Sequence, residues 1–304
     1  MKQTDATSGA LAGIFPAVWT PTDTEGRLLT SALEANLKFL KQGGVHGFMS
    51  LGSTGEFPLL EVKTRQQVLE TTLACADGLP VVANISDVRP KVVQELGRFA
   101  RQAGARAVAV LPPGFYKVAQ SDLVEFLVRA AEAAELPIVL YNFPERVGMR
   151  IELETVEAVA DRVPVAGFKQ SGDEFSYHEP VVRLGRERDF VVFTGADTRL
   201  AEALGIGARG AITGMANAVP ELMVEIFSAC SAGTPEKADL ATERMKSLGP
   251  IIDSLWFPLN ISALMKARGL EVGVPKEVVS SESMARHDEL VNRFAAVFRE
   301  WRLI

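Results

Sequence analysis

The stretch Val165-Ala166-Gly167-Phe168-Lys169-Gln170-Ser171-Gly172 is a short apolar run that ends in a lysine and then a turn. A lysine at the buried end of a strand is costly unless it is used, because burial disfavours the charged ammonium form. The neutral amine that burial favours can attack a carbonyl carbon. A similar run, Pro137-Ile138-Val139-Leu140-Tyr141-Asn142, ends in a tyrosine one strand–helix unit earlier. Two polar residues at such strand ends suggest a shared site.

Short apolar runs of this kind alternate with longer segments that have apolar residues at helical spacing, such as Leu123, Phe126, Leu127 and Ala130. This alternation implies parallel strands joined by right-handed crossovers. Eight units in about 215 residues fit a closed (β/α)8 barrel, whose usual length is ~250 residues. The runs are 13–18, 47–51, 81–85, 107–111, 137–142, 165–169, 190–194 and 210–213. A doubly wound open sheet is the alternative, but no Gly-x-Gly-x-x-Gly follows a strand.

After Ala218 the pattern changes, and residues 220–304 show helical spacing without a convincing strand. The first part of this stretch supplies the eighth barrel helix. We therefore predict an α/β protein: a (β/α)8 TIM barrel over residues 1–234, with its site at the carboxyl ends of the strands. Residues 235–304 form an added C-terminal helical region packed on the barrel.

Composition narrows the class of partner. The chain has 304 residues, 47% of them hydrophobic, and a net charge of −6 without a Lys/Arg-rich block, which argues against nucleic acid. No segment reaches the roughly 18 apolar residues of a membrane span, and residues 1–10 lack a signal-peptide pattern. Cys75 and Cys230 are interpreted as buried thiols in a reducing compartment. We expect a cytoplasmic protein that binds neither nucleic acid nor membrane.

Sites in barrels form at the carboxyl ends of the strands. The polar and loop positions there are Thr20, 52–56, Asn84, 112–116, Tyr141 with Arg146, Lys169 with Ser171, 194–197, and Thr213. In the turn Gly52-Ser53-Thr54-Gly55, hydroxyls and backbone N–H groups could hold a carboxylate, although an ordinary turn with a helix cap is the alternative. Singly, Tyr141, Lys169 and Arg146 could be a core tyrosine, a paired lysine and a surface arginine. Their joint placement favours a site.

The remaining titratable residues indicate no metal site. His46, His178 and His287 form neither a catalytic nor a metal-binding set, and no spacing resembles a zinc site. Glu56 is predicted to open a helix, where the helix dipole favours an acid in the first turn. Asp197 is a further site candidate.

These motifs resemble the dihydrodipicolinate synthase / N-acetylneuraminate lyase family of Schiff-base aldolases. Three of them match in order, and the resemblance covers nearly the whole chain, including the C-terminal region. They are Gly52-Ser53-Thr54-Gly55-Glu56, Tyr141-Asn142-Phe143-Pro144 and Gly167-Phe168-Lys169.

The resemblance implies a role for each matching residue. Lys169 would form a Schiff base with pyruvate or a related 2-oxo acid, and Tyr141 would shuttle protons. Ser53 and Thr54 would hold the carboxylate of the oxo acid, with Thr54 also relaying protons to Tyr141. Because the protonated imine is the electron sink, no metal or organic cofactor is expected. The pocket-lining positions implied are the carbonyl of Ile212 and the turn at Gly195. The family also implies a homotetramer built from tight dimers.

The substrate is less determined. Arg146 matches the arginine with which dihydrodipicolinate synthases bind the aldehyde's carboxylate. Two departures count against a synthase: Ser53 stands where threonine is usual, and Phe115 occupies the relay-tyrosine position that reaches a neighbouring subunit. Tyr116 could substitute only if the loop shifts by one residue. The strings 52–59 and 169–172 also look like the 4-hydroxy-2-oxoglutarate aldolase branch.

We therefore predict a class I lyase that makes or breaks a carbon–carbon bond to pyruvate or a related 2-oxo acid through an imine on Lys169. Its substrate would be a hydroxy-2-oxo acid of the 4-hydroxy-2-oxoglutarate or 2-keto-3-deoxy sugar acid type. One alternative is 4-hydroxy-tetrahydrodipicolinate (dihydrodipicolinate) synthase, which condenses pyruvate with aspartate semialdehyde. The altered position at Phe115 leaves a third possibility, a catalytically silent barrel that binds a 2-oxo acid.

Overall fold

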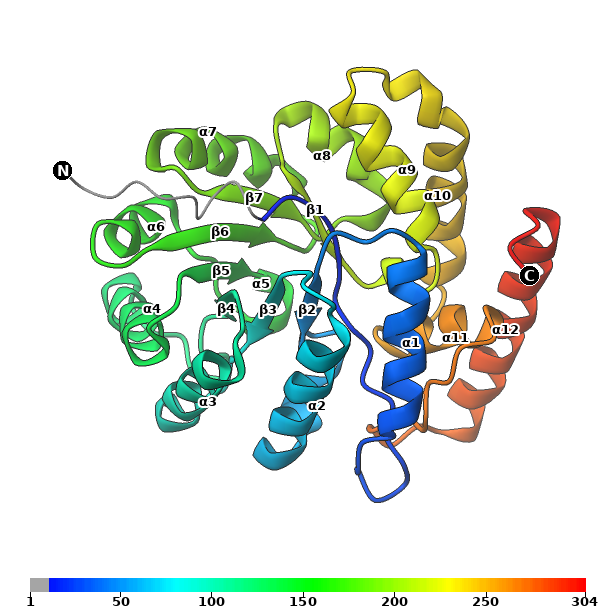
Figure 1. The fold of residues 1–304 in the computed structure, drawn as a ribbon, viewed down its shortest axis with the longest axis horizontal. Helices are drawn as coiled ribbons and strands as arrows, with labels where there is room; N and C mark the ends of the chain where they lie inside the picture. The colour runs from blue at the N-terminus through cyan, green and yellow to red at the C-terminus, as the bar shows by residue number, and fades with distance from the viewer. Residues whose placement is uncertain (1–10) are drawn as a thin grey trace.

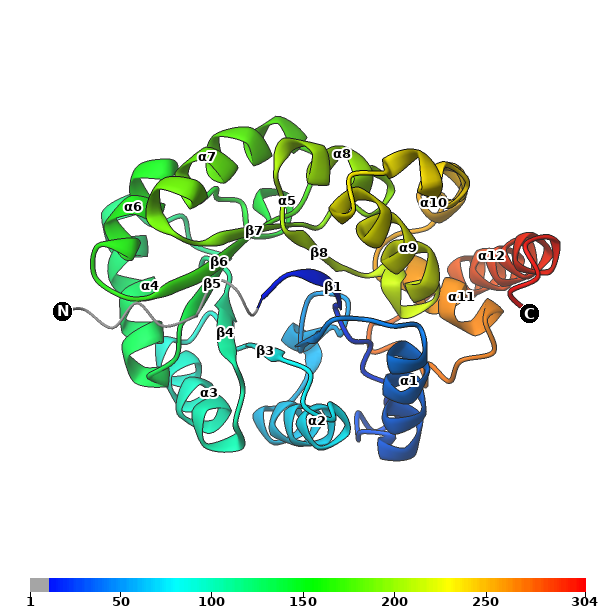
Figure 2. The same ribbon diagram turned by 45° about the horizontal axis from the view of Figure 1, so that its top comes forward.

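The computed structural model describes residues 11–304, which form a barrel of eight parallel strands inside a ring of helices (Figure 2). The strands pair in the order β1-β8-β7-β6-β5-β4-β3-β2. They are β1 (Gly13–Pro16), β2 (Phe48–Ser50), β3 (Val81–Asn84), β4 (Ala107–Val110), β5 (Ile138–Asn142), β6 (Val165–Gln170), β7 (Val191–Thr194) and β8 (Gly210–Thr213). A bridge between Ala17 and Met49 joins β1 to β2. The predicted TIM barrel is confirmed, and the doubly wound open sheet was wrong.

Each strand is followed by a helix that covers it. The barrel helices are α1 (Thr30–Gln42), α2 (Val62–Cys75), α3 (Pro90–Ala103), α4 (Gln120–Ala134), α6 (Leu153–Ala160), α7 (His178–Arg188), α8 (Leu200–Ile206) and α9 (Pro220–Ser231). In α3 the buried residues Val93, Leu96, Gly97 and Ala100 recur at the spacing of one helical face. That face packs on the sheet, while the opposite face meets water.

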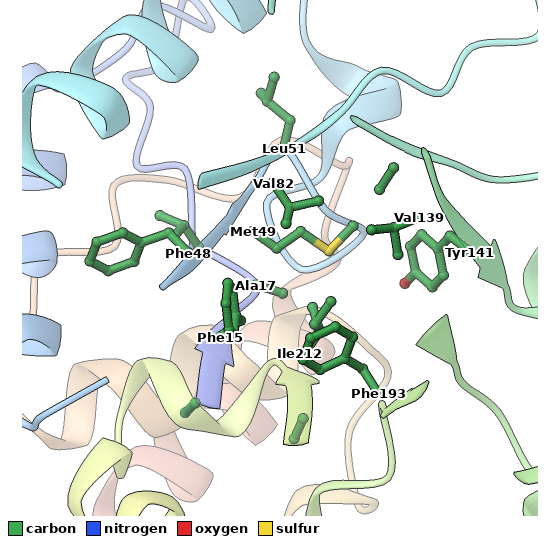
Figure 3. Packing of buried hydrophobic residues seen from close by; sticks show 14 of the residues in the cluster. Phe15, Ala17, Phe48, Met49, Leu51, Val82, Val139, Tyr141, Phe193 and Ile212 are labelled. Carbon is green, nitrogen blue, oxygen red and sulfur yellow. The ribbon is translucent and has the colours of Figure 1, made fainter. Parts of the chain in front are cut away.

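Nearly every strand residue is buried, because one face of each strand meets the helices and the other fills the barrel. Figure 3 shows Met49 from β2 reaching across the interior toward Tyr141 of β5, with Phe193 and Ile212 beside it. This packed apolar interior lies directly beneath the polar residues at the carboxyl ends of the strands.

The C-terminal region lies outside the ring, beside α9 and α1 (Figures 1 and 2). It contains α10 (Asp239–Ile252), α11 (Leu259–Ala267) and α12 (Ser281–Glu300). The division predicted between residues 234 and 235 falls where the short 3-10 helix η6 (Pro235–Ala238) begins. One hydrophobic core runs through both parts, from Phe15 in β1 to Phe298 in α12.

No helix within residues 11–304 is long and apolar enough to cross a membrane. The absence of a signal-peptide pattern was predicted for residues 1–10, which lie outside the described part of the chain.

Candidate active site

Tyr141 and Lys169 lie side by side. They are register partners on the adjacent parallel strands β5 and β6, at the carboxyl end of the barrel. The Lys169 amine lies 4.0 Å from the centroid of the Tyr141 ring. The sequence suggested that these two strand ends share a site, and the structure places their side chains in contact.

The lysine side chain is buried in largely apolar surroundings. Only 3% of its surface is exposed, and its amine lies 3.8 Å from the sulfur of Met49. The amine therefore faces the Met49 sulfur and the Tyr141 ring rather than bulk water. The pair is braced by the outward-facing residues Asn142 and Gln170, whose side chains hydrogen-bond at 2.8 Å across the same two strands.

The turn after β2 contains backbone donors that have no acceptor among the described residues. The Gly55 amide donates to the Gly52 carbonyl and the Glu56 amide to the Ser53 carbonyl, each at 3.0 Å. Among the described residues, the amides of Ser53 and Thr54 donate to no protein acceptor. Two adjacent unpaired N–H groups form a concavity suited to an anion such as a carboxylate.

The hydroxyl that contacts Tyr141 belongs to Ser53, with 3.2 Å between Ser53 Oγ and Tyr141 Oη. Thr54 lines the cavity and faces Gly214, at which an added Cβ would lie 3.1 Å from Thr54 Oγ1. The relay role predicted for Thr54 stays a prediction, and the contact with Tyr141 Oη in the structure is made by Ser53.

A cavity of about 630 Å³ opens above these residues. Six of the predicted site residues line it: Thr54, Tyr141, Arg146, Lys169, Gly195 and Ile212. Ser53 joins the site through its contact with Tyr141. Gly195 has to be glycine, because a Cβ there would lie 2.2 Å from Ser171 Oγ and 3.0 Å from Ser171 Cβ.

Asp197, the further candidate, bridges the loops after β7 and β8. Its Oδ1 accepts from the Met215 amide at 2.9 Å, and its carboxyl interacts with the Thr213 hydroxyl. Burial raises the pKa of Asp197, and these hydrogen bonds and the charge of Lys169 oppose the rise. The acid therefore belongs to the same electrostatic site as the lysine.

Asn260, in α11, was not predicted. It is 7% exposed, lines the cavity, and its Oδ1 has no hydrogen-bond partner among the described residues. No pattern in the sequence marks it, because it sits in an apolar helix far from any strand end.

Arg146 stands at the outer part of the cavity, in the short helix α5 (Pro144–Val147). Its guanidinium lies 5.6 Å from the ring of Phe143 and 5.1 Å from the ring of Phe257, which comes from the C-terminal region. Stacking on both rings orients the planar guanidinium and leaves its edge free for a carboxylate.

The loop after β4 does not reach the cavity within one chain. Phe115 and Tyr116 are 87% and 75% exposed, and their rings contact each other edge to face. Phe115 has a φ of 83°, a left-handed conformation that a bulky residue adopts rarely. Neither residue lines the pocket formed by the described residues.

Several predictions for other residues need correction. Glu56 does not open an α-helix: it has a left-handed φ of 56°, precedes the 3-10 helix η2 (Phe57–Leu59), and forms an ion pair with Lys276. The cysteines are free as predicted, but half-buried rather than buried. His178 and His287, placed in polar segments, are instead buried.

His287 deserves comparison with a catalytic serine–histidine pair. Its Nε2 lies 3.1 Å from Ser262 Oγ, and Asp288 contacts its Nδ1. Ser262 donates its only proton to the Leu259 carbonyl at 2.8 Å, so the imidazole must be the donor in the contact. This is the reverse of nucleophile activation. No cluster of three or more potential metal ligands occurs within residues 11–304.

A (β/α)8 barrel with a buried lysine amine, a tyrosine hydroxyl and a hydroxyl-bearing anion turn at the carboxyl ends of its strands has the features of a Schiff-base aldolase. The comparison with protein families agrees. The chain belongs to the dihydrodipicolinate synthetase family, whose model matches residues 10–294, and it is a lyase.

Individual relatives are distant in sequence but similar throughout. A 4-hydroxy-tetrahydrodipicolinate synthase of Methanococcoides burtonii is 30% identical, over 86% of this chain and 89% of its own. A prophage protein of Escherichia coli K12 in the same family, solved in complex with pyruvate, superposes with a TM-score of 0.87 at 26% identity, over 97% and 99% of the two chains. A catalytic lysine mutant of Ruminococcus gnavus sialic acid aldolase gives 0.86 at 25% identity, over 96% and 98%.

Proposed function

We propose that this lyase cleaves or forms a carbon–carbon bond next to pyruvate through an imine on Lys169. The observation that carries the proposal is the buried Tyr141–Lys169 pair, held at one level on adjacent strands. A desolvated amine beside a phenol supplies a nucleophile and a proton carrier together. The pyruvate complex of the E. coli relative and the catalytic lysine of the R. gnavus aldolase support the same chemistry here.

In the cleavage direction, the neutral Lys169 amine adds to the C2 carbonyl of the oxo acid to give a carbinolamine. Tyr141 Oη protonates the departing hydroxyl, water leaves, and a protonated imine remains. The resulting phenolate takes the proton of the C4 hydroxyl as the C3–C4 bond breaks, and the imine nitrogen accepts the electron pair. An aldehyde leaves and an enamine stays on the lysine.

The enamine is protonated at C3 from Tyr141, and water added at C2 then releases pyruvate and restores the amine. Ser53 Oγ, 3.2 Å from Tyr141 Oη, is the group that orients this proton carrier. The amides of Ser53 and Thr54 hold the oxo-acid carboxylate. The imine serves as the electron sink, so this scheme requires no metal or organic cofactor.

We propose a hydroxy-2-oxo acid as the substrate, of the 4-hydroxy-2-oxoglutarate or 2-keto-3-deoxy sugar acid type. Asp197 and Asn260 supply oxygen atoms along the cavity that suit substrate hydroxyls. Arg146 suits a second carboxylate at the outer end. These groups favour a polar, hydroxylated substrate over a short unsubstituted aldehyde.

The synthase reaction, pyruvate with aspartate semialdehyde, is the second candidate. It is favoured by Arg146 and by the names of relatives such as the M. burtonii protein. Phe115, which cannot carry a proton at the position where the synthases have their relay tyrosine, counts against it. The third candidate, a silent barrel that binds a 2-oxo acid, would leave the pair of Tyr141 and Lys169 unused.

Borohydride trapping tests the chemistry. Pyruvate with borohydride should add one reduced pyruvate to Lys169, seen by peptide mass spectrometry, and a Lys169→Ala variant should show no adduct. The absence of an adduct with pyruvate and with other 2-oxo acids in the wild-type protein would refute the proposal. Pyruvate release from a panel of hydroxy-2-oxo acids, set against condensation with aspartate semialdehyde, separates the first two candidates. Turnover that is lost in Tyr141→Phe excludes the silent barrel.

We also propose that the chain forms a homo-oligomer, with a homotetramer as the form that the family resemblance implies. The exposed ring pair of Phe115 and Tyr116 supports this, since adjacent exposed aromatic side chains on a strained loop are suited to contact with a second copy.

A further inference from the structure

A buried ion pair joins the C-terminal region to the turn after β2. Lys276 Nζ lies 2.5 Å from Glu56 Oε2, and the two side chains are only 4% and 6% exposed. Lys276 also donates to the Thr20 carbonyl at 2.7 Å and lies 5.0 Å from the centroid of the Trp19 ring. The ammonium group thus contacts the loop after β1 and the turn after β2 at once.

The residues that precede Lys276 in the chain are fixed by contacts of their own. The Trp19 indole N–H donates to the Val272 carbonyl at 2.8 Å, and the Val274 amide donates to the Thr22 carbonyl at 2.9 Å. An added Cβ at Gly273 would lie 2.3 Å from the Thr22 carbonyl oxygen. Lys276 is therefore held in place by backbone contacts that do not depend on its own charge.

Glu56 is the last residue of the turn that supplies the anion-binding amides. Its own amide closes the turn onto the Ser53 carbonyl at 3.0 Å, and its φ is 56°. The turn also packs closely on the loop after β1, because a Cβ on Gly55 would lie 2.8 Å from the Val18 carbonyl oxygen. The Ser53 carbonyl and the Thr54 amide belong to one planar peptide unit, so a shift of Glu56 would move that amide with it.

A buried ion pair is weak evidence for a gain in stability, because desolvation of both charges offsets most of their attraction. Such pairs can instead select one backbone arrangement. Here the carboxylate end of Glu56 is bound while its backbone sits in a left-handed conformation that is unfavourable for a non-glycine residue. The attraction between Lys276 and Glu56 offsets the cost of the left-handed backbone at Glu56. It does so only when the turn has its observed shape, because only then does the carboxylate reach the ammonium group.

We propose that Lys276 is a positioning residue for 2-oxo acid binding, which acts through Glu56 on the turn at Ser53 and Thr54. The inference rests on the proposed function of that turn. It assigns to the C-terminal region a part in binding the oxo-acid carboxylate, although Lys276 touches neither the cavity nor Lys169.

The test measures how adduct formation on Lys169 depends on pyruvate concentration. In Lys276→Met the half-saturating pyruvate concentration should rise about tenfold, the loss expected when one charge-assisted hydrogen bond is weakened. The adduct at saturation should stay complete, because the lysine and tyrosine are untouched. Lys276→Arg should restore part of the affinity.

Arg268→Met is the matched control. Arg268 is another C-terminal cation with an 8% exposed side chain, paired with Glu221 at 2.6 Å, and it does not contact the turn. Its loss should lower thermal stability without shifting the pyruvate dependence. An equal shift in both variants would mean general loosening and would overturn the inference, as would an unshifted Lys276→Met.

If Lys276→Met does not fold, Glu56→Gln/Lys276→Met leaves no unpaired charge and carries the same criterion. Adduct formation by the wild-type protein distinguishes failure of the proposed function from failure of the positioning role. Absence of any wild-type adduct refutes the proposed function of the site, whereas a normal wild-type adduct with unshifted Lys276 variants refutes only the positioning role.

Discussion

Replacing Ser53 with alanine removes one hydroxyl and leaves the backbone amide in place. The Ser53 Oγ–Tyr141 Oη distance of 3.2 Å is longer than the optimum for two hydroxyls, so the bond is a weak neutral one of ~1 kcal/mol. If it orients the proton carrier in the transition state, kcat should fall about fivefold to tenfold. Tyr141→Phe removes the carrier itself and should cost about 100-fold or more.

Steady-state pyruvate release by Ser53→Ala, Tyr141→Phe and the double variant measures this coupling. Once the phenol is gone, Ser53→Ala should have little further effect, because both changes act on one hydrogen bond. Ser53→Thr keeps the hydroxyl and should retain kcat. Thr54→Val should raise KM more than it lowers kcat. Fully additive losses, or a kcat defect in Thr54→Val with none in Ser53→Ala, would return the relay to Thr54.

Three further outcomes are expected. Gly195→Ala should destabilise the protein by about 1–3 kcal/mol, because the new Cβ would lie 3.0 Å from Ser171 Cβ and no rotamer change relieves that contact; an unchanged Tm and activity would contradict this. Burial lowers the pKa of His46, His178 and His287. The unfolded chain therefore binds more protons below about pH 6.5, and the free energy of unfolding should fall as the pH is lowered from about 7.5 to about 5.5, by up to ~1.4 kcal/mol per histidine per pH unit. A Tm that does not change over this pH range would refute it. Changing Phe115 and Tyr116 to serine should reduce the oligomeric state seen by sedimentation; an unaffected oligomer would place the interface elsewhere.

The barrel could be predicted because its signal is local. Each strand is a short apolar run between polar turns, and burial on both faces removes the need for alternation. The run that ends in Lys169 and the run that ends in Tyr141 could be placed near each other because successive parallel strands are usually neighbours. Their exact register could not be predicted in this way, because the pairing of β5 with β6 shifts by one residue between Ile138 and Val139.

Contacts between residues far apart in the sequence could not be predicted. Glu56 looks like a helix-opening acid because its partner lies 220 residues away and its left-handed φ leaves no mark in the sequence. Phe257 beside Arg146 and Asn260 in the cavity come from a region where only helical spacing is visible. Whether Ser53 or Thr54 meets Tyr141 depends on the rotation of one turn, which neighbouring hydroxyls cannot reveal.

The contact between Phe257 and Arg146 shows that the two ends of the cavity are built by different parts of the chain. The groups proposed to make and break bonds, Tyr141 and Lys169, stand on strands, where inserting one residue would turn a side chain to the opposite face and abolish the proposed reaction. The groups at the outer end of the cavity come partly from residues 235–304, which can vary without disturbing strand register. Exchanging the part of that region that carries Phe257 and Asn260, with Lys276 kept, offers a recombination route to new aldehyde partners for the proposed imine chemistry.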